Sequence, residues 1–380
     1  MRIHLNTVHL NNAGASLPSP EVLDAMIGHL RSEAELGPIE AARAAPGAVD
    51  LFHTVAARLL GSAPEEIAWC DSASRAWATA VDLFDWGEGD RIIVSRLDYG
   101  GALASLRAAA TRRGAVVEVG PCDGHGRLVP DELEKLLRTG PRAVAVTHAA
   151  AHCGAVNDAV AIGRVTRAAG VNYLLDAAQS AGQMPLAVDD IGCDALVAPG
   201  RKWLRGPRGS AVLYLRTATT SGLAPGFADV ATGDAPGARR VELWERSQAA
   251  AIGLGMALAQ LEESIVSDAA HLDRIGVLAR RARSGLEDLA GVDVWGPPEQ
   301  RSGIVGFTVD GLDPRHVMDG CAAAGVTISV MDASAAPLDF PGRGAGAVCR
   351  VSPHTTNTED EIDEFLTVVD RLRVSGAGRG

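Results

Sequence analysis

The sequence predicts an α/β protein built on a mostly parallel sheet, and three observations lead to this prediction. Short apolar segments alternate with amphipathic segments of helix length through the first two thirds of the 380 residues. Such alternation is typical of β-α units, in which helices cover both faces of a parallel sheet. Two apolar segments lead into charged residues, Asp176 and Lys202, as strands do beside a ligand crevice. The last third mixes strands with helices, as a smaller α+β domain would.

The predicted elements follow one another in a regular order. Two strands end at Asp176 and just before Lys202, and further strands are expected at 91–95, 115–119, 143–147 and 210–215. Helices are expected between these strands, at 101–113, 130–137 and 159–169. Residues 217–239 are rich in Gly, Ala, Thr and Pro and predict a loop. The following elements are helices at 242–264 and 269–289 and strands at 303–309, 326–330 and 347–352.

Composition and charge exclude several classes of protein. The formal net charge of −12 leaves no broad basic surface for a phosphate backbone, so nucleic-acid partners are not expected. The first residues lack the apolar core of a signal peptide, and no apolar run appears long enough to span a membrane. The spacing of the cysteines indicates a reduced, cytoplasmic protein without a disulfide framework; they are Cys70, Cys122, Cys153, Cys193, Cys321 and Cys349.

Asp176 and Lys202 form the most informative pair in the sequence. Burial of a carboxylate or an ammonium group is costly, so charged residues at strand ends usually face a ligand crevice. Pyridoxal phosphate requires both groups: a carboxylate that keeps its pyridine nitrogen protonated, and an amine that bonds to its aldehyde. A solvent-facing Asp and a surface Lys would explain each residue singly. They do not explain both residues in this order.

A second motif, CDSASRAW at 70–77, predicts a phosphate-binding helix start. Small residues separate an apolar strand from a helix there. The first backbone N–H groups of the helix and the positive end of its dipole therefore suit a phosphate, at Ala73, Ser74 and Arg75. Capping by Ser72 or Ser74 explains the same pattern, and the two interpretations are compatible.

Taken together and in this order, the motifs resemble the class V aminotransferase-like family of fold type I pyridoxal-phosphate enzymes. The resemblance covers nearly the whole chain, from HLNNAG at 9–14 to RVSP at 350–353. It implies a large domain with a mostly parallel seven-stranded sheet at 21–240, and a smaller α+β domain at 241–380 that residues 1–20 join. It also implies pyridoxal 5′-phosphate as cofactor and a homodimer.

The resemblance assigns cofactor roles to individual residues. Lys202 matches the Schiff-base lysine, Asp176 the partner of the pyridine nitrogen, and Gln179 the residue that bonds the phenolic oxygen. Tyr99 falls where the family stacks an aromatic residue on the cofactor; it is a weaker acid than the histidine of desulfurase relatives. Arg201 can replace a phosphate-binding histidine, whereas Pro199 cannot replace a hydroxyl. The catalytic set is thus Lys202, Asp176 and Tyr99, and the cofactor-binding set adds Ala73, Ser74, Arg75, Gln179 and Arg201.

The resemblance also implies a substrate side of the site. Arg350 matches the arginine that receives the α-carboxylate of the substrate, a task that bidentate guanidinium geometry suits. Relatives often have Asn where this chain has Ala151, so His152 is the expected polar contact. The N-terminal residues Asn12, Ala13 and Gly14 complete the predicted substrate-binding set.

A metal site is not predicted, although His148 and His152 have the i, i+4 spacing of helical zinc ligands. The two histidines directly follow a predicted strand, so they are expected on a loop. No acidic third ligand stands near them in the sequence.

Departures from the family indicate the reaction. Cysteine desulfurases carry a nucleophilic Cys on a loop before the carboxylate-binding arginine; residues 329–338 contain none, and their nearest match is Ser334. A serine hydroxyl is far too basic to form a persulfide, so desulfuration is disfavoured.

The motif RKWLRGPRG at 201–209 is most similar to one subgroup of the family. That subgroup includes the ergothioneine C–S lyase, the lincosamide sulfur-processing enzymes and isopenicillin N epimerase-like proteins. We therefore expect a C–S β-lyase that cleaves a cysteine S-conjugate in natural-product (for example antibiotic) biosynthesis. Two alternatives share the motifs: decarboxylation coupled to oxidative deamination, which yields an aldehyde, and aminotransfer or epimerisation.

The motifs disfavour two other classes of function. A non-catalytic member of the fold is disfavoured, because Lys202, Asp176, Gln179 and Arg350 are all present. A nicotinamide-binding protein is disfavoured, because no G-x-G-x-x-G motif opens a first β-α unit. In the expected homodimer, Arg246 stands near the position from which relatives reach the neighbouring subunit's phosphate.

Overall fold

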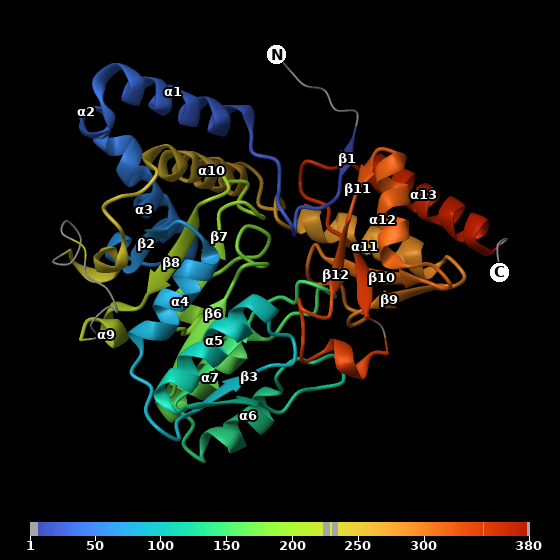
Figure 1. The fold of residues 1–380 in the computed structure, drawn as a ribbon, viewed down its shortest axis with the longest axis horizontal. Helices are drawn as coiled ribbons and strands as arrows, with labels where there is room; N and C mark the ends of the chain where they lie inside the picture. The colour runs from blue at the N-terminus through green and yellow to red at the C-terminus, as the bar shows by residue number, and fades with distance from the viewer. Residues whose placement is uncertain (1–6, 223–228, 230–234, 345, 378–380) are drawn as a thin grey trace.

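The computed structural model describes residues 7–222, 229, 235–344 and 346–377, and they form two bodies around separate sheets (Figure 1). The larger body contains a seven-stranded sheet and the smaller body a four-stranded sheet. In Figure 1 the smaller body, in orange and red, lies to the right of the larger one. The predicted α/β fold with a mostly parallel seven-stranded sheet is confirmed.

In the large sheet β8 runs antiparallel to both of its neighbours, β2 and β7, and the other pairs of described strands are parallel. The strand order is β2-β8-β7-β6-β5-β3-β4. Register pairs Thr147 with Asp176 and Asp176 with Val197, so the ends of β5, β6 and β7 meet at one edge. The strands are β2 (Ile67–Cys70), β3 (Arg91–Val94), β4 (Val116–Val119), β5 (Ala143–Thr147), β6 (Asn172–Asp176), β7 (Ala195–Pro199) and β8 (Ala211–Leu215).

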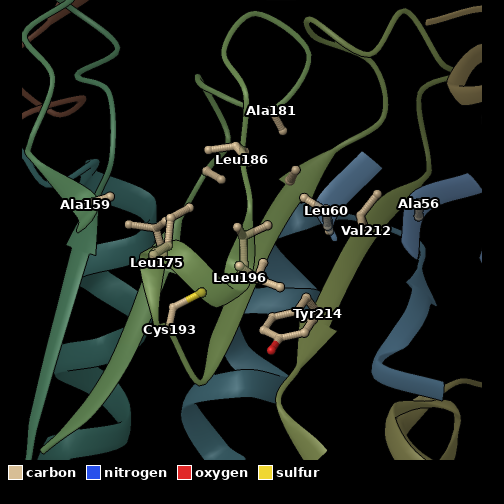
Figure 2. Packing of buried hydrophobic residues seen from close by; sticks show 14 of the residues in the cluster. Ala56, Leu60, Ala159, Leu175, Ala181, Leu186, Cys193, Leu196, Val212 and Tyr214 are labelled. Carbon is tan, nitrogen blue, oxygen red and sulfur yellow. The ribbon is translucent and has the colours of Figure 1, made fainter. Parts of the chain in front are cut away.

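Helices cover both faces of this sheet. One face carries α4 (Ala73–Leu83) and α5 (Gly100–Arg113); the other carries α3 (Pro46–Leu60), α6 (Pro130–Leu137), α7 (Ala159–Ala169), α8 (Val188–Ile191) and α10 (Gln248–Ser267). Because successive strand residues point to opposite faces, Leu175 and Leu196 enter the second core while Leu174 enters the first. Figure 2 shows Leu175 and Leu196 in that second core, together with Tyr214 and with Leu60 of α3.

The small body is an antiparallel sheet covered by helices. Its strand order is β12-β13-β10-β9, and an apolar core joins the sheet to the helices. Strand β1 (Val8–His9) pairs in parallel with β11 (Val326–Thr327), so the N-terminal segment reaches this body. The other elements are β9 (Val292–Trp295), β10 (Val305–Val309), β12 (Ser329–Asp332), β13 (Ala347–Val351), α11 (Asp273–Glu287), α12 (Pro314–Ala323) and α13 (Glu359–Ala377).

Helix α10 follows the predicted domain boundary at 240 but packs with the large sheet. It lies against α1 (Pro20–Leu36) and α3, and Leu254 and Leu258 belong to the large core. We therefore propose that the small domain begins after α10. By length and mean hydropathy alone (20 residues, 1.3) α10 could cross a membrane, contrary to the expectation from the sequence. Half of its apolar window is buried in the protein, as in a core helix.

Two segments differ from the predicted elements or extend them. Before β2 the structure has α1 (Pro20–Leu36), α2 (Pro38–Ala44) and α3, each with Pro at its first position, where the missing N–H costs nothing. The predicted loop at 217–239 contains α9 (Thr217–Thr220) and leads into a short 3₁₀ turn at Gly237–Val241. Its residues 223–228 and 230–234 lie outside the described part of the chain.

Candidate active site

A cavity of about 310 Å³ lies at the carboxyl ends of β6 and β7. Asp176 ends β6, and Lys202 follows shortly after β7; both side chains line the cavity. Parallel neighbouring strands end at the same edge of the sheet, which explains why residues distant in sequence meet here. The start of α4, the start of α5 and the turn after β7 supply most of the remaining walls.

The carboxyl group of Asp176 is buried at the base of this cavity. Its Oδ1 accepts a hydrogen bond from the Ala178 N–H at 2.9 Å. Burial raises the pKa of Asp176, while the Ala178 N–H and the charge of Lys202 oppose the rise. A cationic ring nitrogen placed against this carboxylate would favour its ionised form further. The environment thus suits the predicted partner of a pyridine nitrogen.

Lys202 lies in a tight turn that fixes its backbone. The Gly200 N–H donates to the Ser210 carbonyl at 2.8 Å, and the Gly206 N–H donates to the Gly200 carbonyl at 2.7 Å. Arg205 has a φ of 54°, in the left-handed region that non-glycine residues seldom adopt. The Lys202 side chain is therefore presented from a rigid support.

The Lys202 amine is unusually acidic. Burial and the nearby positive charge of Arg201 lower its pKa to about 7, although Asp176 opposes the shift. A large fraction of the amine is then neutral near physiological pH, which nucleophilic attack on an aldehyde requires. The sequence contains one other lysine, Lys135, which is exposed on α6 and paired with Glu132. Lys202 is thus the lysine placed to react in the cavity.

The start of α4 faces the cavity through Ser72, Ala73 and Ser74. Ser72 Oγ accepts a hydrogen bond from the Arg75 N–H at 3.2 Å, so the predicted cap is present. This bond occupies the Arg75 N–H, and the Arg75 guanidinium pairs with Asp71 at 3.4 Å in an exposed position. The structure therefore does not bring Arg75 to the cavity, whereas Ala73 and Ser74 are placed to offer N–H groups to a phosphate.

Two arginines add positive charge to the cavity. Arg201, which the sequence analysis selected, lines the cavity, and its guanidinium also donates to the Gly14 carbonyl. Arg208 lines it as well, and this residue was missed. Burial together with the charge of Arg208 lowers the pKa of Arg201. The motif GPRG at 206–209 could have indicated Arg208. An arginine in the same tight turn as the lysine lies close to the ligand that the lysine binds.

Tyr99 forms one wall of the cavity. Its N–H donates to Thr147 Oγ1 at 3.1 Å. The buried Asp98 carboxylate accepts from the N–H groups of Ser95 at 2.6 Å and Thr147 at 2.7 Å, which ties the segment after β3 to β5. The Tyr99 ring centre lies 5.9 Å from Lys202 Nζ. An aromatic surface is therefore available where the resemblance predicts one.

Gln179 lies behind the lysine turn rather than in the cavity. Its side-chain oxygen accepts from Trp203 Nε1 at 2.9 Å, and its Nε2 donates to the Ala13 carbonyl at 3.1 Å. Trp203 is fully buried and stacks on His354. Gln179 is not among the described residues that line the cavity, and its bond to the cofactor stays a prediction. In this structure it braces the turn.

The N-terminal residues also support the turn from behind. The Asn12 side chain donates to the Ser352 carbonyl at 2.8 Å, and the Ala13 N–H donates to Ser352 Oγ at 3.0 Å. The Gly14 carbonyl accepts from Arg201. Asn12, Ala13 and Gly14 do not line the cavity among the described residues, and their contact with substrate stays a prediction.

Arg350 is buried near the lysine and held by three acceptors, and it does not itself line the cavity among the described residues. Its guanidinium donates to Ser329 Oγ at 3.0 Å, to the Ala151 carbonyl at 3.1 Å and to Asn11 Oδ1 at 3.1 Å. Burial lowers the pKa of Arg350 to about 10, so it stays protonated near neutral pH. Its charge contributes to the lowered pKa of Lys202. Asn11 is a further residue that the sequence analysis missed.

His152 is fully buried and does not line the cavity among the described residues. Its Nε2 lies 2.9 Å from Asp339 Oδ2. The contact of His152 with substrate stays a prediction. An acidic neighbour does exist, contrary to the sequence analysis, because Asp339 comes from a loop 187 residues away.

Comparison with known proteins decides the family. A family model described as aminotransferase class-V matches residues 8–365. A probable hercynylcysteine sulfoxide lyase from Mycobacterium tuberculosis is 30% identical over 98% of this chain and 91% of its own length. The chain belongs to the class V aminotransferase family. The predicted family is thus confirmed.

Two further proteins are similar to the chain. A probable cysteine desulfurase from Mycobacterium leprae is 27% identical over 98% of the chain, which spans 63% of that relative. An apo cysteine desulfurase structure from Thermococcus onnurineus has a TM-score of 0.88 at 24% identity, covering 97% of this chain and 95% of that one. The second comparison shows the fold alone. The protein is a pyridoxal-phosphate-dependent enzyme of lyase type.

The residues of the cavity fit the class V cofactor. Arg201, Arg208 and the start of α4 provide positive charge for a phosphate, and Asp176 provides a carboxylate for a ring nitrogen. Lys202 provides an amine with a lowered pKa for an aldehyde. These residues complement the phosphate, the ring nitrogen and the aldehyde of pyridoxal phosphate. No partner for its phenolic oxygen lines the cavity among the described residues.

Proposed function

We propose that the enzyme is a C–S β-lyase that cleaves a cysteine S-conjugate. The observation that carries this proposal is the lack of a thiol at the cavity: among the described residues that line it, none is a cysteine. Five of the six cysteines are buried elsewhere, and Cys122 is half-buried. Ser334 occupies the loop position where desulfurases of the family carry their nucleophile. Without that nucleophile the sulfur leaves with its own substituent.

Residues of this chain would hold the cofactor and prepare it. Bound pyridoxal phosphate supplies an electron sink for negative charge that develops at the substrate Cα. Asp176 keeps a proton on the ring nitrogen, and Tyr99 offers an aromatic surface. Arg201, Arg208 and the N–H groups of α4 hold the phosphate by charge-assisted hydrogen bonds.

Lys202 and Arg350 would act on the substrate. Arg350 is held from three sides and presents its guanidinium to the α-carboxylate. Lys202 accepts the Cα proton, the Cα electron pair forms the double bond to Cβ, and the Cβ–S pair leaves as a thiolate. Water then converts the aminoacrylate product to pyruvate and ammonia. A thiolate with a pKa of roughly 8 to 9 needs little acid assistance, so a tyrosine in place of a proton-donating histidine is tolerated.

The proposal includes a role in natural-product biosynthesis and a homodimeric state. The lyase-like turn around Lys202 and the 30% identity to a probable hercynylcysteine sulfoxide lyase support a role in the biosynthesis of a sulfur-containing natural product. A homodimer is supported by apolar side chains on the surface: Leu23 and Leu30 lie seven residues apart on α1, and Trp244 is also exposed.

Product analysis tests the reaction. The holoenzyme is incubated with a set of S-substituted cysteines and their sulfoxides, and pyruvate, thiol or sulfenic product, aldehyde and carbon dioxide are measured. The proposal predicts pyruvate in a one-to-one ratio with the sulfur product. Aldehyde and carbon dioxide without pyruvate would select decarboxylative deamination instead. Persulfide formation or amino transfer to a keto acid would contradict the lyase.

A further inference from the structure

One loop of the small body contacts the segment that forms a wall of the cavity. Residues 333–343, between β12 and β13, are called here the mouth loop. The Gly100 N–H donates to the Ala335 carbonyl at 2.9 Å, and a Cβ on Gly100 would collide with the Ser334 carbonyl oxygen. Tyr99, directly before Gly100, lines the cavity. The position of the mouth loop therefore affects the wall of the site.

A buried polar pair anchors this loop to the large body. His152, in the segment after β5, has its Nε2 2.9 Å from Asp339 Oδ2 of the mouth loop. The two side chains are only 1% and 2% exposed. The His152 ring also contacts the rings of Phe340 and Trp295, with centroids 5.4 Å and 6.4 Å away. These contacts leave the imidazole little freedom to turn.

The electrostatic surroundings favour the charged form of this pair. Burial alone would lower the pKa of His152, but the neighbouring Cys153 and the Asp339 carboxylate outweigh burial and raise the pKa to about 9. Asp339 also accepts from Arg343 Nε at 2.6 Å, and Arg96 lies 3.9 Å away. Loss of either partner leaves the other as a buried charge with fewer counter-charges, which is strongly unfavourable.

The same side chains could be read as a metal site. The ligand atoms of His152, Cys153 and Asp339 lie within 4.8 Å of one another. Two arginines already neutralise the Asp339 carboxylate, and their charge would repel a cation. An ion pair explains the cluster better than a metal does.

A second contact links this segment to the substrate arginine. The carbonyl of Ala151, the residue before His152, accepts a hydrogen bond from Arg350 at 3.1 Å. We propose that His152 and Asp339 are positioning residues, whose ion pair fixes the mouth loop at the cavity and the Ala151 carbonyl that orients Arg350. This positioning role is separate from the proposed lyase reaction. It rests on the proposed function only for the choice of an S-conjugate as the assay substrate.

The test compares His152→Gln, Asp339→Asn and the double variant as holoenzymes. Hydrogen exchange of the 333–343 amides should become about tenfold faster or more in each, because the loop loses its buried anchor. KM for the S-conjugate should rise at least about fivefold with kcat nearly unchanged, as expected when uniform binding is lost. The double variant should be no worse than the worse single variant, since the two residues act as one unit.

His53→Gln is a matched control, because His53 forms another buried pair, with Glu242 at 2.6 Å. It should leave the exchange of the mouth loop and KM unchanged. Unchanged loop exchange in folded His152 and Asp339 variants, or additive effects in the double variant, would overturn the proposal. If His152→Gln does not fold, hydrogen exchange of the mouth loop in Asp339→Asn tests the proposal alone. This measurement needs no turnover, so it stays informative even if the lyase proposal fails.

Discussion

At the residue scale, the buried carboxyl of Asp176 is expected to matter for rate more than for cofactor affinity. Its charge acts mainly when negative charge develops on the substrate, so Asp176→Asn should lower kcat by roughly two orders of magnitude. Steady-state kinetics and cofactor titration check this. Asp194→Asn is the control, because Asp194 is also a buried carboxyl but lies at the other end of β7, bonded to the Tyr173 N–H. Full activity of an Asp176→Asn protein with cofactor bound would remove Asp176 from this role.

The lowered pKa of Lys202 predicts that the rate of cofactor uptake depends on pH. Its pKa is lowered to about 7, so the neutral fraction of the amine rises as pH increases through that value. The rate of pyridoxal phosphate uptake by apoprotein should therefore rise about tenfold per pH unit below 7 and level off above it. Stopped-flow absorbance measures the rate. A rate still rising steeply between pH 8 and 10 would mean that Lys202 has an ordinary lysine pKa.

Individual residues were predictable where chemistry and local sequence coincide. Asp176, Lys202 and Arg201 lie at the cavity because strand ends and a Gly-rich turn place them there. The partners that His152 and Gln179 have in the structure could not be predicted, because packing between distant segments sets them. Asp339 contacts His152 although 187 residues separate them in sequence, and no local sequence pattern predicts such a contact.

At the scale of elements, the turn after β7 and the start of α4 share the binding of phosphate. Arg208→Gln should raise the dissociation constant of pyridoxal phosphate about tenfold, the effect of losing one charge-assisted hydrogen bond. Equilibrium titration measures it. Arg205→Gln provides the control from the same turn, because Arg205 donates to the Leu17 carbonyl and does not line the cavity among the described residues. Equal effects of both changes would indicate a damaged turn instead of a lost contact.

Elements themselves were largely predictable. The central strands of the large sheet are short apolar runs buried on both faces, and residues 143–147 form β5 at the predicted bounds. Helix α7 likewise occupies the predicted residues 159–169. The body against which helix α10 packs could not be predicted, because its apolar surface is compatible with either core. Only packing against α1 and α3 decides between them.

At the scale of the whole molecule, the exposed apolar surface of α1 is expected to be the contact between two copies of the chain. The wild-type enzyme should be a dimer at micromolar concentration by light scattering. Leu30→Asp should weaken the dimer, because a charge buried in an apolar interface is costly. Val374→Asp, at another exposed apolar position on α13, should leave it intact. A wild-type monomer would contradict the proposal.

The expected subunit contact from Arg246 is less well supported. Its guanidinium pairs with Glu242 of the same chain and lies 5.8 Å from the Trp69 ring. A partner's phosphate would have to compete with these neighbours. Trp244, exposed beside it, is the better candidate for a contact across the dimer.

The most direct measurement locates the bond between cofactor and protein. Purified enzyme is reduced with borohydride, digested, and mapped by mass spectrometry. Only Lys135 and Lys202 can carry the label, because the sequence has no other lysine. We predict a single stable adduct on Lys202, retained in Lys135→Ala and lost in Lys202→Ala together with the visible absorption. An adduct on Lys135, or none on wild-type enzyme supplied with pyridoxal phosphate, would contradict the active site described here.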